Sequence, residues 1–182
     1  NPGQAAANAA AAREAMMKRF DRDGDGKLNA QEQLAATRAL QERGIRTPAT
    51  NRSYSVNEGN RRSFPEGYQS YLDWAQERGY SSRYVGSMVA DVHRILLKGG
   101  VFLYPPTKKA PSGKLRLMYE ANPMAMLIEQ AGGRALAAPG QRILDVQPKA
   151  IHERTPVILG SSEEVDHVAA QPLGGDADVF GG

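Results

Sequence analysis

Apolar side chains beyond about residue 50 recur in two alternating patterns, one helical and one strand-like. Met88, Val92 and Ile95 are three or four residues apart, and a Gly-Gly pair follows at 99–100, so a core-facing helix is predicted over 86–98. A second helix is predicted over 123–131, ending at another Gly-Gly pair, with an inner face formed by Met124, Leu127, Ile128 and Ala131. Both helices are expected to pack one apolar face against a sheet.

Short β-prone runs lie between these helices and are bounded by Gly, Pro and Asn. They predict one strand that begins at Tyr54 and further strands over 101–104, 114–120, 134–137, 143–146 and 156–160. Asn122 is expected to cap the helix that begins at Pro123. Ser161 and Glu164 have the spacing of a capping box and predict a final helix. The alternation of strands and helices predicts a layered α/β domain.

The segment before residue 50 is rich in helix formers and contains a different motif, Asp21 to Glu32. Its spacing of carboxylates around a central glycine matches the EF-hand calcium loop. The expected oxygen ligands are Asp21, Asp23, Asp25, the backbone carbonyl of Lys27, Asn29 and Glu32. The alternative is an acidic, glycine-containing turn that binds nothing. No second loop of this kind occurs in the sequence, so a lone hand is expected to bind weakly or to dimerise.

Composition narrows the class of protein. A chain of 182 residues without cysteine has room for one domain and an appendage, and it forms no disulfides. No apolar run reaches the roughly 20 residues that a membrane helix needs. The domains are therefore predicted as 1–50, a helix-loop-helix segment, 51–170, the α/β domain, and 171–182, a disordered tail rich in Gly.

Positive charge is concentrated in one part of the chain. The formal net charge is +3, and residues 52–120 hold eleven Lys and Arg against six Asp and Glu, whereas the chain beyond Glu120 is net acidic. The cations occur in separate short blocks, which favours a local anion site over nucleic acid binding. Neither a nucleic acid nor a membrane is an expected partner, and a cytoplasmic location is predicted.

Three blocks carry side chains suited to phosphate. Asn57 follows a predicted strand, and the guanidinium of Arg83 precedes a predicted helix, where it is able to meet phosphate oxygens in a bidentate pair. In the predicted strand 114–120, period-two geometry puts Lys114, Arg116 and Glu120 on one face. The alternative is a strand whose polar face is simply hydrated.

The same blocks carry a resemblance to a known family. Asn57-Glu58-Gly59, the run from Ser82 to Arg94 and the run from Lys114 to Glu120 resemble the C-terminal half of class I fructose-1,6-bisphosphatase, with the likeness extending from about Tyr54 to about Val165. The resemblance implies an α/β/α domain with a mixed sheet. It also implies metal-assisted hydrolysis of the 1-phosphate of fructose 1,6-bisphosphate, with Mg²⁺ as the divalent cation.

The resemblance assigns roles to individual residues. Asn57 contacts the 6-phosphate of the sugar, and Tyr84 contributes to the site of its own subunit. Arg83 reaches the site of the neighbouring subunit, which implies a homo-oligomer. Tyr104 and Lys114 contact the 6-phosphate or the sugar. Arg116 lies near the metals, and Glu120 is the metal ligand. One departure is Asn60, where the family often has a Tyr that touches the same phosphate. No catalytic residue is assigned.

The family's N-terminal half, with its Asp-Pro-Leu-Asp-Gly metal motif, does not occur in this sequence. Glu120 alone is not expected to hold several divalent cations, because a stable site needs several oxygen ligands. Three hypotheses follow: a bisphosphatase completed by another chain, a non-catalytic, calcium-responsive module that binds fructose 6-phosphate or fructose 1,6-bisphosphate, and a non-functional chimeric fragment. A sedoheptulose bisphosphatase is disfavoured, because the run from Arg83 to Arg94 follows the fructose enzymes.

Overall fold

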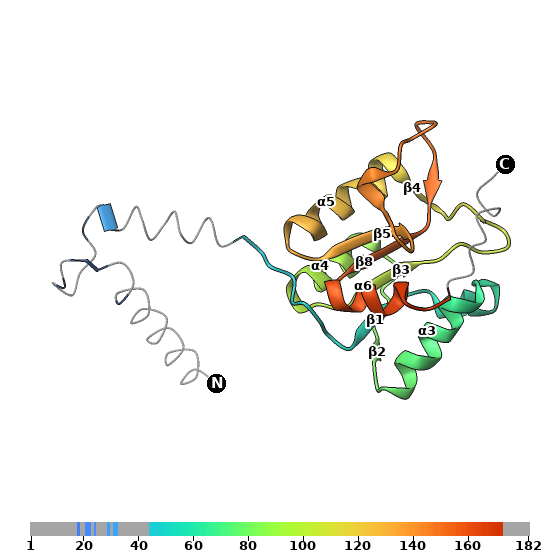
Figure 1. Ribbon diagram of the computed structural model, residues 1–182, viewed down its shortest axis with the longest axis horizontal. Helices are drawn as coiled ribbons and strands as arrows, with labels where there is room; N and C mark the ends of the chain where they lie inside the picture. Colours follow the sequence, from blue (N-terminus) through green and yellow to red (C-terminus); the bar gives the residue numbers. More distant parts are fainter. Residues whose placement is uncertain are drawn as a thin grey trace. The chain divides into compact units, whose positions relative to one another are not determined.

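The computed structural model of the protein describes residues 18, 21, 22, 24, 29, 31, 32 and 44–172. The chain divides into two compact units, residues 1–44 and residues 45–182. All of the helices and strands discussed below belong to the second unit (Figure 1). The tail predicted over 171–182 lies outside the described residues apart from Gln171 and Pro172, so it stays a prediction.

A mixed sheet forms the centre of the second unit. Within residues 44–172 its order is β2-β1-β3-β8-β5-β6. Strand β1 runs parallel to β2 and to β3, and the other neighbours are antiparallel. The bounds are Ser53–Ser55 for β1, Ser81–Ser82 for β2, Val101–Tyr104 for β3, Arg134–Ala138 for β5, Gln141–Arg142 for β6 and Val157–Gly160 for β8. A separate ladder pairs β4, Leu115–Arg116, with β7, Arg154–Thr155.

Helices cover both faces of this sheet (Figure 1). They are α3, Glu66–Glu77, α4, Met88–Lys98, α5, Asn122–Gln130, and α6, Ser162–Ala169, with short turns η1, Glu58–Ser63, η2, Leu117–Ala121, and η3, Ile143–Asp145. Val101 and Leu103 of β3 belong to one buried cluster, and Phe102 between them belongs to another. Because side chains alternate along a strand, the two clusters lie on opposite faces. The predicted mixed α/β fold is confirmed.

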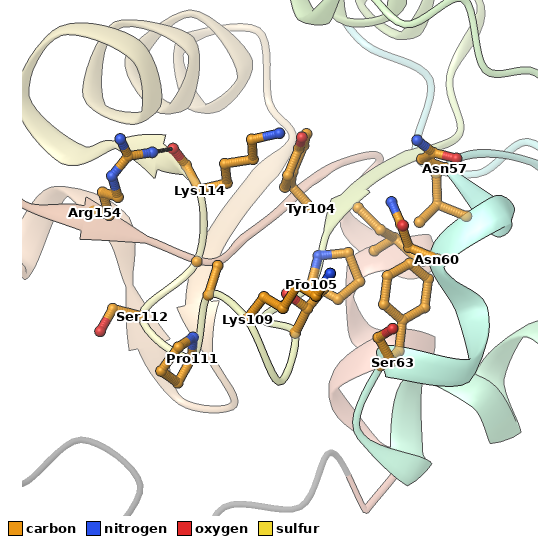
Figure 2. Close-up of a pocket in the computed structure, with 16 residues that line it drawn as sticks. Asn57, Asn60, Ser63, Tyr104, Pro105, Lys109, Pro111, Ser112, Lys114 and Arg154 are labelled. Carbon is orange, nitrogen blue, oxygen red and sulfur yellow. Dashed lines mark hydrogen bonds between the residues drawn. The ribbon is translucent and has the colours of Figure 1, made fainter.

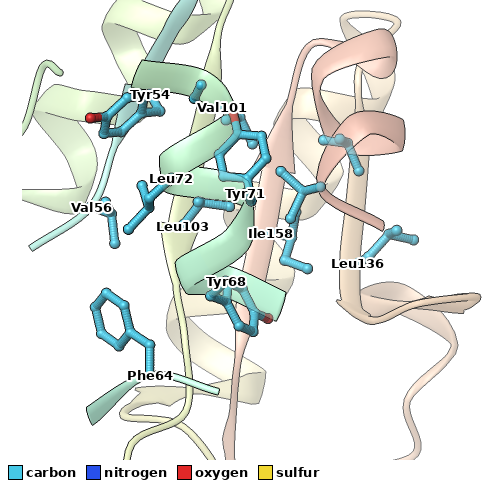
Figure 3. Close-up of a cluster of buried hydrophobic side chains, with 13 residues drawn as sticks. Tyr54, Val56, Phe64, Tyr68, Tyr71, Leu72, Val101, Leu103, Leu136 and Ile158 are labelled. Atoms are coloured by element: carbon cyan, nitrogen blue, oxygen red, sulfur yellow. The ribbon is translucent and has the colours of Figure 1, made fainter. Parts of the chain in front are cut away.

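The first cluster lies between the sheet and helices α3 and α6. Figure 3 shows Tyr68, Tyr71 and Leu72 of α3 directed at Leu103 of β3 and Ile158 of β8, all of them buried. No helix or strand is predicted over residues 66–77, although the apolar residues there recur at helical spacing. The missed helix supplies much of this core.

The second cluster lies under α4 and α5. Val92 and Ile95 of α4 are fully buried, which confirms the predicted inner face of that helix. On α5 the prediction was only partly right, since Leu127 is 49% exposed. Its place in the core is taken by Ala125, which is fully buried.

Two of the predicted strands are wrong. Only Leu115 and Arg116 are extended in the run predicted as a strand over 114–120, and the chain then enters a π-helical turn over 117–121. Leu117 and Ala121 are four residues apart in this turn, and both are fully buried. The run predicted over 143–146 forms the 3₁₀ turn η3 instead.

Two predicted helix caps are also wrong. Asn122 is already inside α5, because the preceding π-helical turn runs straight into it. Ser161 makes no side-chain cap bond; its Oγ donates to the carbonyl of Pro48 at 2.6 Å and accepts the N–H of Gly100 at 3.0 Å. The buried carboxylate of Glu164 accepts the N–H of Asn51 at 3.1 Å. Both side chains thus fasten the segment before β1 to the domain.

None of the helices in the described part of the chain is long and apolar enough to cross a membrane.

Candidate functional site

The carboxyl ends of three neighbouring strands place several of the predicted residues at one edge of the sheet. Strand β1 lies between β2 and β3 and is parallel to both. Asn57 follows β1, Arg83 and Tyr84 follow β2, and Tyr104 is the last residue of β3. In open α/β sheets ligands bind at this edge, beyond the carboxyl ends of the strands.

A pocket of about 650 Å³ opens beside this edge (Figure 2). Its apolar wall includes Val56, Phe64 and Leu103. Its polar lining is Asn57, Asn60, Ser63, Tyr104, Thr107, Lys109, Ser112, Lys114 and Arg154. Three of these described residues are cationic and none of the described lining residues is acidic. The pocket is therefore suited to an anionic ligand that carries hydroxyl groups.

Local structure explains why the asparagines and Ser63 line one wall. Asn57 precedes the 3₁₀ turn η1, and its Oδ1 accepts the N–H of Gly59 at 3.2 Å. A 3₁₀ helix has three residues per turn, so Asn57, Asn60 and Ser63 fall one above another. Figure 2 shows all three on the same side of the pocket, opposite Lys114.

The opposite wall depends on a close approach of two backbones. Gly113 has a φ of +82°, and a Cβ at this position would lie 2.3 Å from the backbone of Thr155. Only glycine accepts this combination of conformation and contact. The pairing of β4 with β7 then brings Arg154 next to Lys114, and the Arg154 guanidinium donates to the carbonyl of Lys114.

The structure gathers some predicted ligands in the pocket and leaves others outside its lining. Asn57, Tyr104 and Lys114 line it together. Tyr84 lies near Tyr104 and Asp91. The pKa of its phenol is raised, mainly by burial and then by these two neighbours. Arg83 is exposed and is not part of the lining.

Arg116 and Glu120 form a separate pair. Glu120 Oε2 accepts the N–H of Arg116 at 2.7 Å and lies 3.6 Å from its guanidinium Nη1. The Arg116 guanidinium carbon is 5.9 Å from the centroid of the Tyr119 ring. Within the described ranges no three acidic or His side chains come together as metal ligands.

Two lining cations were missed by sequence reasoning. Lys109 follows Lys108 in a short basic pair; it is exposed, yet it lines the pocket. Arg154 carried no signal, because it reaches the pocket only through the long-range pairing of β7 with β4. Nothing in the local pattern around residue 154 distinguishes it from a surface arginine.

The predicted calcium loop is described in part. Asp21, Asn29 and Glu32 are described, whereas Asp23, Asp25 and Lys27 lie outside the described residues. The side chain of Glu32 is only 6% exposed, and its two oxygens accept the N–H of Arg22 at 2.7 Å and of Asn29 at 3.0 Å. Glu32 therefore bridges the two ends of the loop, as the last ligand of a calcium loop has to do.

Fold and pocket together define an α/β domain with a pocket lined by cations at the carboxyl edge of its sheet. The family model described as "Fructose-1-6-bisphosphatase, C-terminal domain" matches residues 47–171. The chain therefore belongs to the fructose-1,6-bisphosphatase family, through the C-terminal domain of that family.

Curated relatives and solved structures agree with this assignment. The class 1 fructose-1,6-bisphosphatase of Chlorobium chlorochromatii is 53% identical over 132 residues, covering 69% of this chain and 39% of the relative. That of Synechococcus elongatus is 56% identical over 133 residues, covering 72% and 38%. The holo form of Leishmania major fructose-1,6-bisphosphatase superposes with a TM-score of 0.67 at 47% identity, over 69% of this chain and 40% of that one. The chain thus spans about two fifths of the length of these relatives.

Proposed function

We propose that residues 47–171 are the sugar-phosphate-binding part of a fructose-1,6-bisphosphatase. The observation that carries this proposal is the pocket itself, which joins Asn57, Tyr104 and Lys114 with two further cations and has no acidic residue among its described lining. A phosphate dianion is stabilised by such a set of cations and polar donors, and carboxylates in its place would repel it. The apolar wall suits the ring carbons of the sugar.

The roles of the individual residues are proposed from the resemblance to the family, and the shared pocket of Asn57, Tyr104 and Lys114 supports them. Asn57 and Lys114 bind the 6-phosphate, with Tyr84 and Tyr104 beside the phosphate or the sugar. Arg83 is exposed at the same edge and serves the site of a neighbouring copy in a homo-oligomer. Asn60 lines the pocket with the polar end of a short side chain, where relatives often have a tyrosine.

Hydrolysis of fructose 1,6-bisphosphate needs more than this domain supplies. Arg116 and Glu120 lie next to each other and are proposed to face the reacting phosphate, with Glu120 as one ligand of Mg²⁺. Mg²⁺ prefers several oxygen ligands, and the described residues offer one carboxylate here. A complementing N-terminal half, on another polypeptide or as a further part of the same one, would bring the rest. Without it we expect binding and no turnover.

Calorimetric titration of the folded chain with fructose 6-phosphate tests the proposal. We expect binding that weakens as salt is raised, because screening reduces the attraction of the cations for phosphate. Fructose, the same sugar without the phosphate, is the matched control and should not bind measurably. A separate assay follows phosphate release from fructose 1,6-bisphosphate with Mg²⁺, with and without an added N-terminal half. Absence of fructose 6-phosphate binding at low salt would overturn the proposal and favour a non-functional chimeric fragment.

A second proposed function is calcium binding by residues 21–32. The donor set consists of hard oxygen atoms, which Ca²⁺ prefers, and the inward position of Glu32 supports a closed loop. If fructose 6-phosphate binds with a different Kd when Ca²⁺ is present, the chain is a calcium-responsive sugar-phosphate module. An unchanged Kd would mean that the loop acts independently of the pocket.

Substituting Glu32→Gln tests this loop. We expect the Kd for Ca²⁺ to rise by roughly a hundredfold, because a bidentate carboxylate becomes a neutral amide with one weaker donor oxygen. Calorimetric titration with CaCl₂ is the measurement. Glu77→Gln, an equal change of charge at the exposed end of α3, is the control and should bind as the wild type does. Equal affinity in Glu32→Gln would show that residues 21–32 are an ordinary acidic turn.

A further inference from the structure

The Arg83-Tyr84 pair is held from both sides by carboxylates that lie outside the pocket. On one side, Glu58 Oε1 accepts the hydroxyl of Ser82 at 2.9 Å and that of Tyr54 at 3.0 Å. Its other oxygen accepts Gln76 Nε2 at 3.0 Å. Glu58 therefore connects the turn after β1 with the end of β2 and with helix α3.

On the other side, the carboxylate of Asp91 is fully buried in the first turn of α4. Its Oδ2 accepts the N–H of Val85 at 3.2 Å, and its Oδ1 lies 3.0 Å from Nη1 of Arg94. A buried carboxylate that meets both a cation and a backbone amide is strongly held, because each bond is formed where water does not compete.

The main chain of Arg83 is fixed between these two contacts. Its N–H donates to the carbonyl of Tyr54 at 2.8 Å. Its carbonyl accepts Nη1 of Arg94 at 2.7 Å and the hydroxyl of Ser55 at 2.6 Å. That hydroxyl also lies 3.1 Å from Asp91 Oδ1 and accepts Nη2 of Arg94 at 2.6 Å. In the loop after β2, Arg83 is thus bonded to β1 and α4, and Val85 is bonded to α4.

We infer that Asp91, with Arg94 and Glu58, positions the Arg83-Tyr84 loop for the phosphosugar. This inference rests on the proposed function. Neither Asp91 nor Glu58 lines the pocket, so each acts through the loop and not by touching the ligand. The loop has only a two-residue strand, β2, to define its course, and the carboxylates replace the backbone ladder that a longer strand would provide.

The test is the substitution Asp91→Asn, which keeps the size of the side chain and creates no cavity. An amide has one acceptor oxygen where the carboxylate has two, so either the bond from Val85 or the bond from Arg94 is lost, and Arg94 loses its counter-charge. We expect amide hydrogen exchange at Val85 to become at least about tenfold faster, and the Kd for fructose 6-phosphate to rise by about tenfold. Exchange in β8 should remain as slow as in the wild type at temperatures where the variant is folded.

The matched control is Glu129→Gln, which breaks the ion pair of Glu129 with Arg142, Oε2 to Nη2 2.6 Å, at the opposite edge of the sheet. It removes an ion pair without touching the loop, and its Kd should stay that of the wild type. Glu58→Gln is the second variant and should free Ser82 and weaken binding in the same direction. It also replaces Asp91→Asn if that protein fails to fold.

The outcomes separate the two proposals. Wild-type exchange at Val85 in Asp91→Asn, or faster exchange with an unchanged Kd, would overturn the positioning role and leave the pocket as the sugar-phosphate site. A loss of affinity in Glu129→Gln as large as in Asp91→Asn would assign the effect to general stability. Failure of the wild-type chain to bind fructose 6-phosphate would overturn the proposed function and this inference with it.

Discussion

Replacing Lys114 by Met is expected to weaken fructose 6-phosphate binding by roughly tenfold to a hundredfold. The side chain keeps its length and loses its ammonium group, so the phosphate loses a charge-assisted hydrogen bond. Such bonds contribute about 1.5–3 kcal/mol, and 1.4 kcal/mol corresponds to a factor of ten in Kd. Lys114 lies on the wall opposite Asn57 and Asn60 (Figure 2), and the guanidinium of Arg154 beside it is bonded to the Lys114 carbonyl.

Calorimetric titration of the two proteins at the same low ionic strength measures this effect. Lys108→Met is the control, because Lys108 is exposed and does not line the pocket, although it belongs to the same basic stretch of sequence. It changes the net charge by the same amount. If both variants lose affinity equally, the pocket binds phosphate only through the diffuse positive charge of the domain.

Gly160→Ala is expected to lower the free energy of unfolding by about 3 kcal/mol or more. Gly160 ends β8 in the middle of the sheet with a φ of +149°. A Cβ there would lie 2.1 Å from the carbonyl oxygen of Gly100 and 2.9 Å from Cα of Val101. Both contacts are with the backbone of the adjacent strand, so neither is relieved by rotating a side chain. The strands β3 and β8 would have to separate.

Urea denaturation followed by circular dichroism measures this loss. Gly140→Ala is the matched control, because Gly140 also has a positive φ, +75°, but no heavy atom lies within 4 Å of its Cβ position. It should cost only about 1–2 kcal/mol, the penalty for a left-handed conformation. Equal losses at both positions would mean that backbone conformation, and not the close approach of β3 and β8, limits residue 160.

Several elements of the fold could be predicted from local pattern. Helix α4 was predicted with its inner face because Val92 and Ile95 recur at a helical period and two glycines follow. Strands β3, β5 and β8 were recognised as short apolar runs between turn residues. Helix α3 has a similar pattern in Tyr68, Tyr71 and Leu72, so this helix too is predictable from the local spacing of its apolar residues.

The π-helical turn η2 could not be read in this way. In the run after Gly113 the apolar residues alternate, which is typical of a strand. The structure has a helical turn there instead, and its residues Leu117 and Ala121 both pack into the core beneath α5. The same turn sets the position of Glu120 relative to Arg116. Burial by residues distant in sequence outweighed a local preference, as is common for short runs.

For the site, the residues themselves determined the chemistry. The blocks around Asn57, Arg83, Tyr104 and Lys114 predicted phosphate as the ligand and the bisphosphatases as the family, because residue type and spacing are local properties of the chain. Only the tertiary structure decided which of these side chains share a pocket, that Lys109 and Arg154 join them, and that Asp91 and Glu58 support the loop between. These contacts depend on strand pairing and loop closure between segments 20 to 50 residues apart. The free energy of such long-range contacts is not determined by any local pattern.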